Sequence, residues 1–246
     1  MQPLFAIITI TFNAADTIGR TVESIDSQTF TDYEHLVVDG ASRDNTVELV
    51  AARPNPRRSV ISEPDKGLYD AMNKGISHTT GKYLIFLNAG DKFHSADTLE
   101  MIAKAISDNN TPGIVYGQTD IVDNEGRRLG PRHLSAPEKL TLKSFAQGML
   151  VCHQAFVALR RITGSYDLKY RYSADFDWCI RCLQHSKKNI GLVDTVFIDY
   201  LSEGVTTNNR FSSLRERFRI MSYYYGFIPT VARHIVFIFR ALKRKL

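Results

Sequence analysis

Acidic and amide side chains follow buried apolar segments of this sequence, at the point where each segment ends. The segment 83–87 reads Tyr-Leu-Ile-Phe-Leu, and Asn88, Ala89, Gly90 and Asp91 follow it. Five apolar or aromatic residues without polar alternation favour a strand that is buried on both faces. Ligands of open α/β sheets bind beyond the carboxyl ends of the strands. Asp91 is therefore expected where a charged ligand, or a metal ion carrying one, would bind, although these residue types also form simple turns.

Two earlier strand ends carry polar side chains of the same kind: Thr9, Thr11 and Asn13 near the end of segment 4–12, and Asp39 after segment 36–38. In a parallel sheet these ends lie on one edge. A carboxylate there can accept hydrogen bonds from a base or ribose. A second carboxylate can hold Mg²⁺, which commonly binds one or two carboxylates plus substrate phosphates.

The sequence contains neither GxxxxGK[ST] nor GxGxxG, so a phosphate cradle of the P-loop or Rossmann kind is not expected. Phosphate charge would instead be met by a metal ion and by side chains such as Lys66.

The elements that must position these residues alternate along the first hundred residues. Strands are predicted at 4–12, 36–38, 60–61 and 83–87, each followed by a helix, the last of these at 96–107. This alternation predicts a parallel sheet with right-handed crossovers and helices on both faces. The second half is predicted to contain a hairpin (114–122 and 127–129), helices at 137–145 and 174–184, a strand at 192–200, and helices from about 212.

Length and composition are those of a folded α/β protein. With 246 residues, 43% hydrophobic and 23% charged, we expect one domain over 1–210 and a helical appendage over 211–246. No apolar run reaches the roughly 18–20 residues of a membrane span, and no secretory signal is visible. Three cysteines favour a reducing cytosol, and Cys179 and Cys182 are interpreted as two thiols on a helix.

The net charge of +5 is concentrated at the carboxyl end. Segment 226–246 interleaves aromatic and aliphatic residues with basic ones, which suits a helix in an anionic membrane interface. The alternative is a helix packed on the domain with a solvated basic face. We expect a cytoplasmic protein, peripheral on the inner face of the plasma membrane, with no nucleic-acid partner.

Four ordered motifs resemble the family 2 glycosyltransferases, and most closely the bacterial polysaccharide branch that includes colanic acid glycosyltransferases. The motifs are IITITFN (7–13), VVDGASRDNT (37–46), SEPDKGLYDAMNKG (62–75) and GKYLIFLNAGD (81–91). The resemblance covers about residues 4–205. It implies a GT-A fold, a nucleotide-binding α/β sandwich that uses a nucleotide-diphosphate sugar and Mg²⁺ or Mn²⁺.

The resemblance also implies roles for these motif residues. The end of the first strand (Thr9, Thr11, Asn13) and Asp39 would hold the nucleotide base, and Asp65, Lys66, Asn73 and Asn88 would contact the nucleotide sugar. Asp91 would take the metal-binding place of the family's Asp-x-Asp motif. Asn88 and Gly90 stand where acidic residues are often found, so metal affinity is expected to be weaker, or Asp91 acts alone with phosphate and water.

A second motif, Ser173-Ala174-Asp175-Phe176-Asp177-Trp178, resembles the family's Glu-Asp-x-Asp sequence, with Ala174 in place of the Glu. By position Asp175 matches the catalytic base, which takes the proton of the attacking hydroxyl. Asp177 is the alternative base. His153 and Gln154 resemble the branch's His-Gln pair and would line the acceptor pocket together with Asp177. Residues 202–206 resemble, imperfectly, a Gly-Gly-x-Ser loop near the site.

These observations predict an inverting glycosyltransferase that moves a sugar from a nucleotide-diphosphate sugar to a glycan or lipid-linked acceptor in bacterial surface polysaccharide synthesis. Two alternatives stay open. A sugar nucleotidyltransferase would share the α/β design but release pyrophosphate. A membrane-docked binding module with a degenerate site is favoured by Asn88, Gly90 and Ala174.

Overall fold

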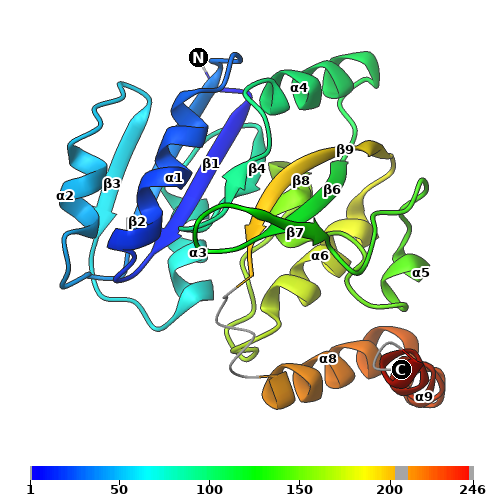
Figure 1. The fold of residues 1–246 in the computed structure, drawn as a ribbon. Coiled ribbons are helices and arrows are strands. Elements are labelled where there is room, and N and C mark those ends of the chain that lie inside the picture. Colours follow the sequence, from blue (N-terminus) through cyan, green and yellow to red (C-terminus); the bar gives the residue numbers. More distant parts are fainter. Residues whose placement is uncertain (1, 203–209, 244–246) are drawn as a thin grey trace.

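The computed structural model describes residues 2–202 and 210–243. One mixed sheet forms its centre, in the strand order β3-β2-β1-β4-β8-β6-β9-β5, with β7 paired to β6 (Figure 1). The strands are β1 (Phe5–Thr11), β2 (Tyr33–Asp39), β3 (Arg58–Ser62), β4 (Tyr83–Phe86), β5 (Lys92–Phe93), β6 (Ile114–Val122), β7 (Arg128–Pro131), β8 (Phe156–Leu159) and β9 (Asn189–Leu201).

Parallel pairing joins β3, β2, β1 and β4, and also β6 to β9. The remaining pairs (β4–β8, β6–β8, β6–β7 and β5–β9) are antiparallel. The parallel half follows from the strand–helix alternation of the first hundred residues. The hairpin predicted around residues 123–126 is confirmed as β6 and β7.

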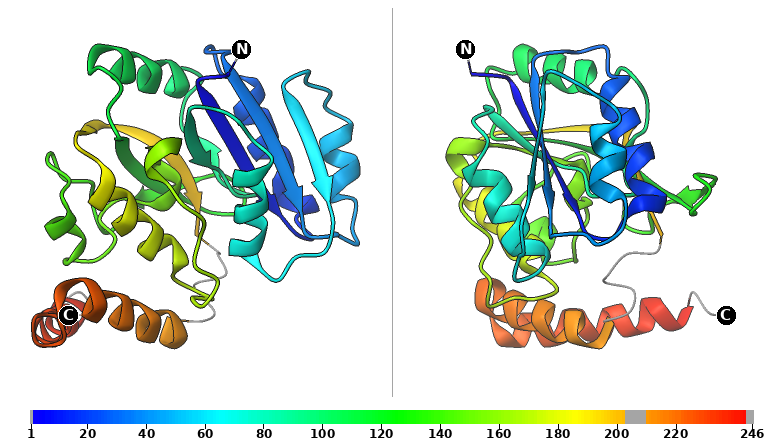
Figure 2. Two further views of the ribbon diagram at one scale, coloured as in Figure 1. Left: turned by 180° about the vertical axis from the view of Figure 1, so that it is seen from behind. Right: turned by 90° about the vertical axis from the view of Figure 1, so that its left-hand side faces the viewer.

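Helices cover both faces of the sheet: α1 (Ala15–Asp26), α2 (Thr46–Ala51), α3 (Leu68–Ser77), α4 (Thr98–Asp108), α5 (Leu142–Phe145), α6 (Ala174–His185), α8 (Arg210–Tyr225) and α9 (Phe227–Lys243). In Figure 2, α1 and α2 lie on one face and α3 and α6 on the other. Helices α8 and α9 lie across the end of the molecule toward which β1 and β9 point (Figure 1). Of the described helices, none is long and apolar enough to cross a membrane.

The core explains why β4 is central. All four of its residues are buried, because β1 flanks it on one side, β8 on the other, and helices cover both faces. Strand β8 and the short 3₁₀ helix before it (His153–Ala155) were not predicted from the sequence. The three cysteines are free and buried, which agrees with two structural thiols on α6.

The helix predicted at 137–145 is wrong in extent. Side chains of β6 hold the backbone of 136–140 in an irregular path. Gln118 bonds to the backbone of Ala136 in both directions, and the Tyr116 hydroxyl contacts the carbonyls of residues 137 and 138. Helix α5 begins only after Thr141, whose side chain forms a capping box with Ser144.

Candidate active site

Asp39 lies at the end of β2, with its side chain buried. Its Oδ2 accepts hydrogen bonds from the backbone N of Ser42 (2.9 Å) and from the hydroxyl of Ser62 (2.6 Å), and its Oδ1 accepts one from the Ser42 hydroxyl. Three donors, two from Ser42 in the loop after β2 and one from Ser62 at the end of β3, therefore fix this carboxylate at the strand edge.

The three polar residues of the first strand end separate into different environments. The Thr9 hydroxyl lies inside the sheet and bonds to Nε2 of buried His35 (3.0 Å), so it does not reach the edge. The Thr11 hydroxyl is buried and has no hydrogen-bond partner within the described residues. Asn13 accepts from the backbone N of Arg43 (2.8 Å) and holds the loop after β2 in place. Of the three, Thr11 is the one with a buried polar atom that lacks a partner among the described residues.

Segment 62–67 approaches the end of β2 closely. A Cβ atom on Gly40 would lie 2.6 Å from Oδ2 of Asp65, so a larger residue there would displace this carboxylate. Oδ1 of Asp65 accepts from the backbone N of Gly67 (2.7 Å). Lys66 is exposed, and its ammonium has no ion-pair partner in the described part of the chain. Asp65 therefore lies against Gly40, the residue after Asp39, and Lys66 follows it in the chain.

The surroundings of Asn73 differ from the nucleotide-sugar contact that the resemblance implies. Its amide oxygen accepts from the backbone N of Tyr166 (2.7 Å), and its amide nitrogen donates to the Tyr166 carbonyl (3.0 Å). Because both ends of the amide form hydrogen bonds to the backbone of Tyr166, Asn73 connects α3 to the segment before α6.

Asp91 follows β4 and is 3% exposed. Its Oδ1 accepts from the backbone N of Leu201 at the end of β9 (2.9 Å), and its Oδ2 accepts from Nε2 of Gln154 (3.0 Å). Burial raises the pKa of Asp91 to about 7, although both hydrogen bonds and Arg20 favour the charged form. A positive charge at this position would restore the carboxylate. The amide oxygen of nearby Asn88 is buried and has no partner among residues 2–202 and 210–243.

The backbone of the 88–91 turn explains why residue 90 is not acidic. Gly90 has φ of 99°, in the left-handed region. A Cβ atom there would lie 2.6 Å from Cδ2 of Leu201. Thr21 of α1 fixes the same turn, since its hydroxyl accepts from the Gly90 N (2.9 Å) and donates to the Asp91 carbonyl (2.7 Å). Sequence reasoning missed Thr21, although it is a polar residue on the apolar face of the predicted helix.

Asp175 lies at the amino end of α6, where the helix dipole favours a carboxylate. Its Oδ1 accepts from the hydroxyl of Tyr69 (3.0 Å) and from the backbone N of Phe176 (2.9 Å). Hydrogen bonds among the described residues leave Oδ2 open. Burial and the neighbouring Asp175 raise the pKa of Tyr69 well above its usual range, so this hydroxyl stays a donor. Tyr69 was not predicted as a site residue.

Asp177 differs from Asp175 in having both oxygens occupied. Oδ2 pairs with Nε of Arg181 (2.8 Å) and Oδ1 accepts from the hydroxyl of Tyr224 on α8 (2.9 Å). Buried in this way, Asp177 joins α6 to the carboxyl-terminal helices.

His153 is also enclosed. Its Nε2 bonds to the hydroxyl of Tyr166 (2.6 Å), and its ring stacks on Phe86 and packs against Trp178. Burial lowers the pKa of His153 to about 4, so the ring is neutral near pH 7. The adjacent Gln154 is buried as well, and its amide holds Asp91.

A continuous path of contacts connects Asp91 to Asp175. Gln154 binds Asp91, His153 precedes it in the chain and bonds to Tyr166, Tyr166 stacks on Tyr69, and Tyr69 donates to Asp175. Burial raises the pKa of Tyr200, and Asp91 and Asp175 both raise it further. Both carboxylates therefore lie close enough to Tyr200 to act on its hydroxyl.

One His/Asp/Asp group in the described residues could also hold a metal ion. His94, Asp120 and Asp199 offer ligand atoms within 4.8 Å of one another. These carboxylates already meet cations: Arg128 bonds to Asp120 (2.5 and 3.1 Å), and Lys92 pairs with Asp199 (3.1 Å). Asp91 is the better candidate for a divalent cation, because the described residues give it no ion-pair partner and its burial disfavours an uncompensated charge. The loop expected at 202–206 lies outside the described residues from 203 onward.

The chain matches the family model described as glycosyl transferase family 2 over residues 6–162. The "PGL/p-HBAD biosynthesis glycosyltransferase" of Mycobacterium bovis is 33% identical over 212 residues, which cover 84% of this chain and 80% of that protein. The "UDP-Glc:alpha-D-GlcNAc-diphosphoundecaprenol beta-1,3-glucosyltransferase WfgD" of Escherichia coli is 26% identical over 222 residues, or 89% and 85% of the two chains.

Solved structures show the same fold. Residues 1–349 of S. aureus TarS superpose with a TM-score of 0.72 at 16% identity, covering 96% of this chain and 72% of that one. The mannosyltransferase PcManGT from Pyrobaculum calidifontis, solved with GDP-Man and Mn²⁺, gives 0.64 at 18% identity, covering 95% and 74%. The expected GT-A architecture is confirmed. With the family model matched over 157 residues and a relative at 33% identity, this chain belongs to glycosyl transferase family 2 and is a glycosyltransferase.

Proposed function

We propose that this glycosyltransferase moves a sugar, with inversion, from a nucleotide-diphosphate sugar to a hydroxyl of a glycan or lipid-linked acceptor in bacterial surface polysaccharide or glycolipid synthesis. The relatives named for glycolipid and polysaccharide-precursor transfer support the acceptor class. TarS has been solved with UDP-GlcNAc and PcManGT with GDP-Man, which supports a nucleotide-sugar donor.

The observation that carries the proposal is the linkage of a buried acid, Asp91, to a half-buried acid with an open oxygen, Asp175. Oδ2 of Asp175 accepts the proton of the acceptor hydroxyl as its oxygen attacks the anomeric carbon. The bond from that carbon to the diphosphate breaks in the same step, on the opposite face of the sugar, and inversion results. Tyr69 orients the base by donating to the other oxygen.

The donor side uses the strand edge of the parallel half. Asp39 and the open hydroxyl of Thr11 face the nucleoside, and Lys66 and Asp91 face the diphosphate. Asp91 would hold a divalent cation, with the unpartnered amide oxygen of Asn88 three residues before it; when bound, the cation neutralises charge on the leaving diphosphate. Asn73, Gln154 and His153 keep these groups in place from behind.

Thermal unfolding in the presence of donors tests the proposal. UDP-, GDP- and dTDP-sugars are added with Mn²⁺, because a ligand that binds only the folded state raises its stability. We expect one nucleotide class to raise the Tm by roughly 5 °C or more at 100-fold excess over its Kd. Incubating that donor with a matching acceptor should release a nucleoside diphosphate. Release of pyrophosphate would establish a nucleotidyltransferase, and binding without turnover would establish a degenerate binding module.

A lipid-linked acceptor supports a location at a membrane. We propose that it works in the cytoplasm as a peripheral protein on the inner face of the plasma membrane, where lipid-linked sugars and nucleotide sugars are both accessible.

A further inference from the structure

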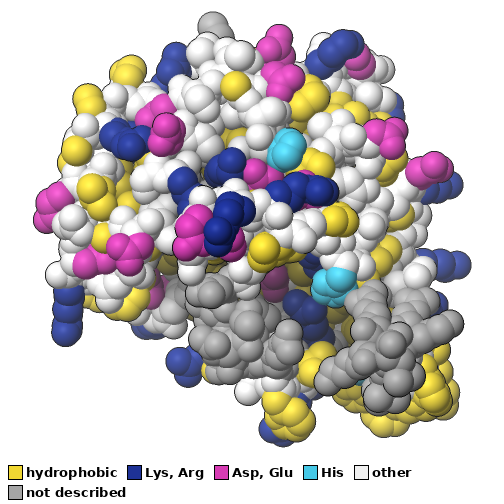
Figure 3. Space-filling model, in the orientation of Figure 1, with side chains coloured by type: hydrophobic (Ala, Val, Ile, Leu, Met, Phe, Trp, Pro, Cys, Tyr) yellow, Lys and Arg dark blue, Asp and Glu magenta, His cyan; other side chains and the backbone are white. Residues whose placement is uncertain are grey.

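Exposed hydrophobic side chains gather on α8 and α9. Of the thirteen large hydrophobic side chains exposed in the described residues, eight belong to these two helices: Phe211, Leu214, Tyr223, Phe227, Ile228, Ile235, Val236 and Phe239. Figure 3 shows hydrophobic side chains collected over this end of the molecule. A contiguous apolar surface on a soluble protein marks an interaction site.

The spacing on α9 forms a single stripe. Its exposed apolar residues recur at helical intervals along one face, at Ile228, Ala232, Ile235, Val236 and Phe239. The opposite face packs on α8, since the rings of His234 and Phe218 lie 5.0 Å apart and Thr230 is buried. One face of helix α9 therefore packs against the protein, and the other face is exposed.

The charge around the stripe has one sign. Residues 210–246 include nine Lys and Arg but only one acidic residue, Glu216. Its carboxylate already accepts hydrogen bonds from the backbone N atoms of Arg171 (2.9 Å) and Tyr172 (2.8 Å). Among the side chains of α8 and α9 that the structure describes, Arg215, Arg217, Arg219 and Arg233 therefore outnumber Glu216, and the surface of these helices complements an anionic partner.

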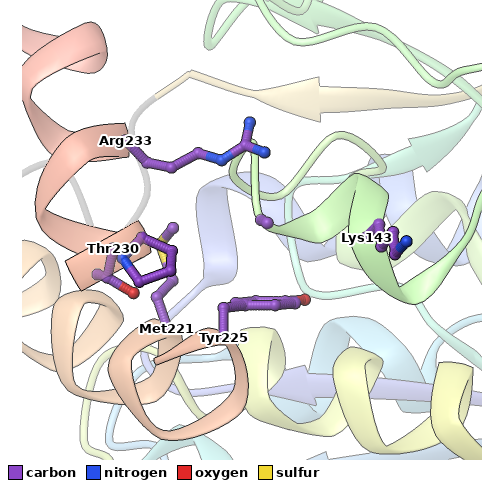
Figure 4. Close-up of a pocket in the computed structure, with 7 residues that line it drawn as sticks. Lys143, Met221, Tyr225, Thr230 and Arg233 are labelled. Atoms are coloured by element: carbon purple, nitrogen blue, oxygen red, sulfur yellow. The ribbon is translucent and has the colours of Figure 1, made fainter. Parts of the chain in front are cut away.

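A hollow of about 210 Å³ lies between α5 and the α8–α9 pair, next to the stripe. Lys143 and Arg233 line different walls, and the Tyr225 ring lies below them (Figure 4). The Tyr225 hydroxyl donates to the Leu142 carbonyl (2.8 Å), and the Thr230 hydroxyl donates to the Gly226 carbonyl (2.7 Å). Within the described part of the chain, neither Lys143 nor Arg233 has an ion-pair partner, so two cations without a counter-charge stand at the walls of this largely apolar hollow.

The geometry points to an anionic phospholipid site. The apolar stripe of α9 enters the acyl region of a membrane, and the headgroup phosphate sits in the hollow between Lys143 and Arg233. The occupant is a bulk anionic phospholipid, because two unpaired cations match a phosphate and the adjoining stripe matches acyl chains.

The lipid site also lies where contact with a membrane would help sugar transfer. This link to sugar transfer rests on the proposed function. Helix α8 is bonded to α6 through Tyr224 and Asp177, two residues after Asp175. The helices lie at the end toward which β1 and β9 point (Figure 1). A membrane under α9 would therefore bring lipid-linked acceptors beside Asp175.

Vesicle co-sedimentation of the full chain tests this site. The vesicles contain either phosphatidylcholine alone or phosphatidylcholine with 30% phosphatidylglycerol. We expect at least tenfold tighter binding to the anionic vesicles, lost at high salt. The double variant Lys143→Ala/Arg233→Ala should lose about tenfold or more, at roughly fivefold per cation. The charge-matched control Arg161→Ala/Lys187→Ala, on exposed residues elsewhere, should lose about twofold or less.

A second pair of variants tests the stripe. Ile235→Asp/Phe239→Asp should abolish vesicle binding, whereas Leu129→Asp, at an exposed residue on β7, should not. An equal loss of vesicle binding in Lys143→Ala/Arg233→Ala and in the control Arg161→Ala/Lys187→Ala would show that the hollow is not a phosphate site. Recovery of binding only with polyprenyl diphosphate in the vesicles would make it an acceptor subsite instead. A dimer that Ile235→Asp/Phe239→Asp converts to a monomer, without vesicle binding, would make the stripe a self-interface.

These outcomes are separable from a failure of the proposed function. Donor stabilisation and transfer to a water-soluble acceptor should be unchanged in the stripe and hollow variants, because none of these residues contacts Asp91 or Asp175. Loss of transfer to a soluble acceptor in them would count against an independent lipid site.

Discussion

The surroundings of Asp91 and Asp175 differ in a way that separates two kinds of chemistry. Asp91 is almost completely buried, each of its oxygens accepts one hydrogen bond, and its pKa is raised to about 7. Asp175 is half-buried, with one oxygen held by Tyr69 and the other open. A rigid buried carboxylate suits a fixed cation, whereas a base needs an oxygen that an incoming hydroxyl can reach.

The largest expected effect is at Asp175. Asp175→Asn should lower kcat by about 10³-fold, because the amide cannot take the proton of the acceptor, while donor binding stays unchanged. Transfer assays and donor-induced thermal shifts measure the two quantities separately. Asp177→Asn is the matched control: it breaks the contacts to Arg181 and Tyr224 and should lower stability more than kcat. A wild-type rate in Asp175→Asn would transfer the role of base elsewhere.

Asp91→Asn should lower activity by about 10²-fold through loss of cation binding, but raise the stability of the unliganded protein at high pH. The folded pKa of Asp91, about 7, exceeds the unfolded value of about 3.9, so the folded state holds the proton more tightly. The contribution of Asp91 to wild-type stability should therefore fall as pH rises from about 4 to about 7, and level off above that.

The difference in Tm between Asp91→Asn and wild type measures the effect of this carboxylate alone, because the buried histidines titrate in both proteins. It should be near zero at pH 4 and favour the variant at pH 8 by several degrees. Mn²⁺ with nucleotide should stabilise the wild type and not the variant. A pH-independent difference would show that Asp91 is already ionised without a cation.

Gln154→Leu should lower activity by about tenfold and raise the Mn²⁺ concentration needed for half-maximal rate, because the amide positions Asp91. A purely structural role would reduce Tm while leaving the metal dependence unchanged. Gln154→Glu would place a second negative charge beside the buried carboxylate of Asp91. We expect it to lower activity more than Gln154→Leu does.

The smallest effect is expected at Tyr69. Tyr69→Phe removes one hydrogen bond to Asp175 while retaining the ring that stacks on Tyr166. We expect kcat to fall about fivefold with KM unchanged. An unchanged kcat would mean that the helix end alone orients Asp175.

Much of the parallel half was predictable because its signals are local. Buried apolar segments, each ending in a polar group, predict strands and their common edge, and β1, β2 and β4 follow this pattern. The second half was less predictable. Strand β8 has only four residues and is followed by Arg160 rather than by an acidic or amide residue. Helix α5 was shortened by Tyr116 and Gln118, which lie about twenty residues away in sequence.

The sequence by itself determined the family, the strand edge and the two acids, because residue types and their order carry that information. Only the tertiary structure decided which polar atoms are free. Hydrogen bonds to other segments occupy the side chains of Thr9, Asn73, His153 and Asp177. Among the described residues, polar atoms without a partner remain on Thr11, Lys66 and Asp175. The physical reason is that a hydrogen bond or a burial cost depends on which segments meet in space, and no local pattern specifies that meeting.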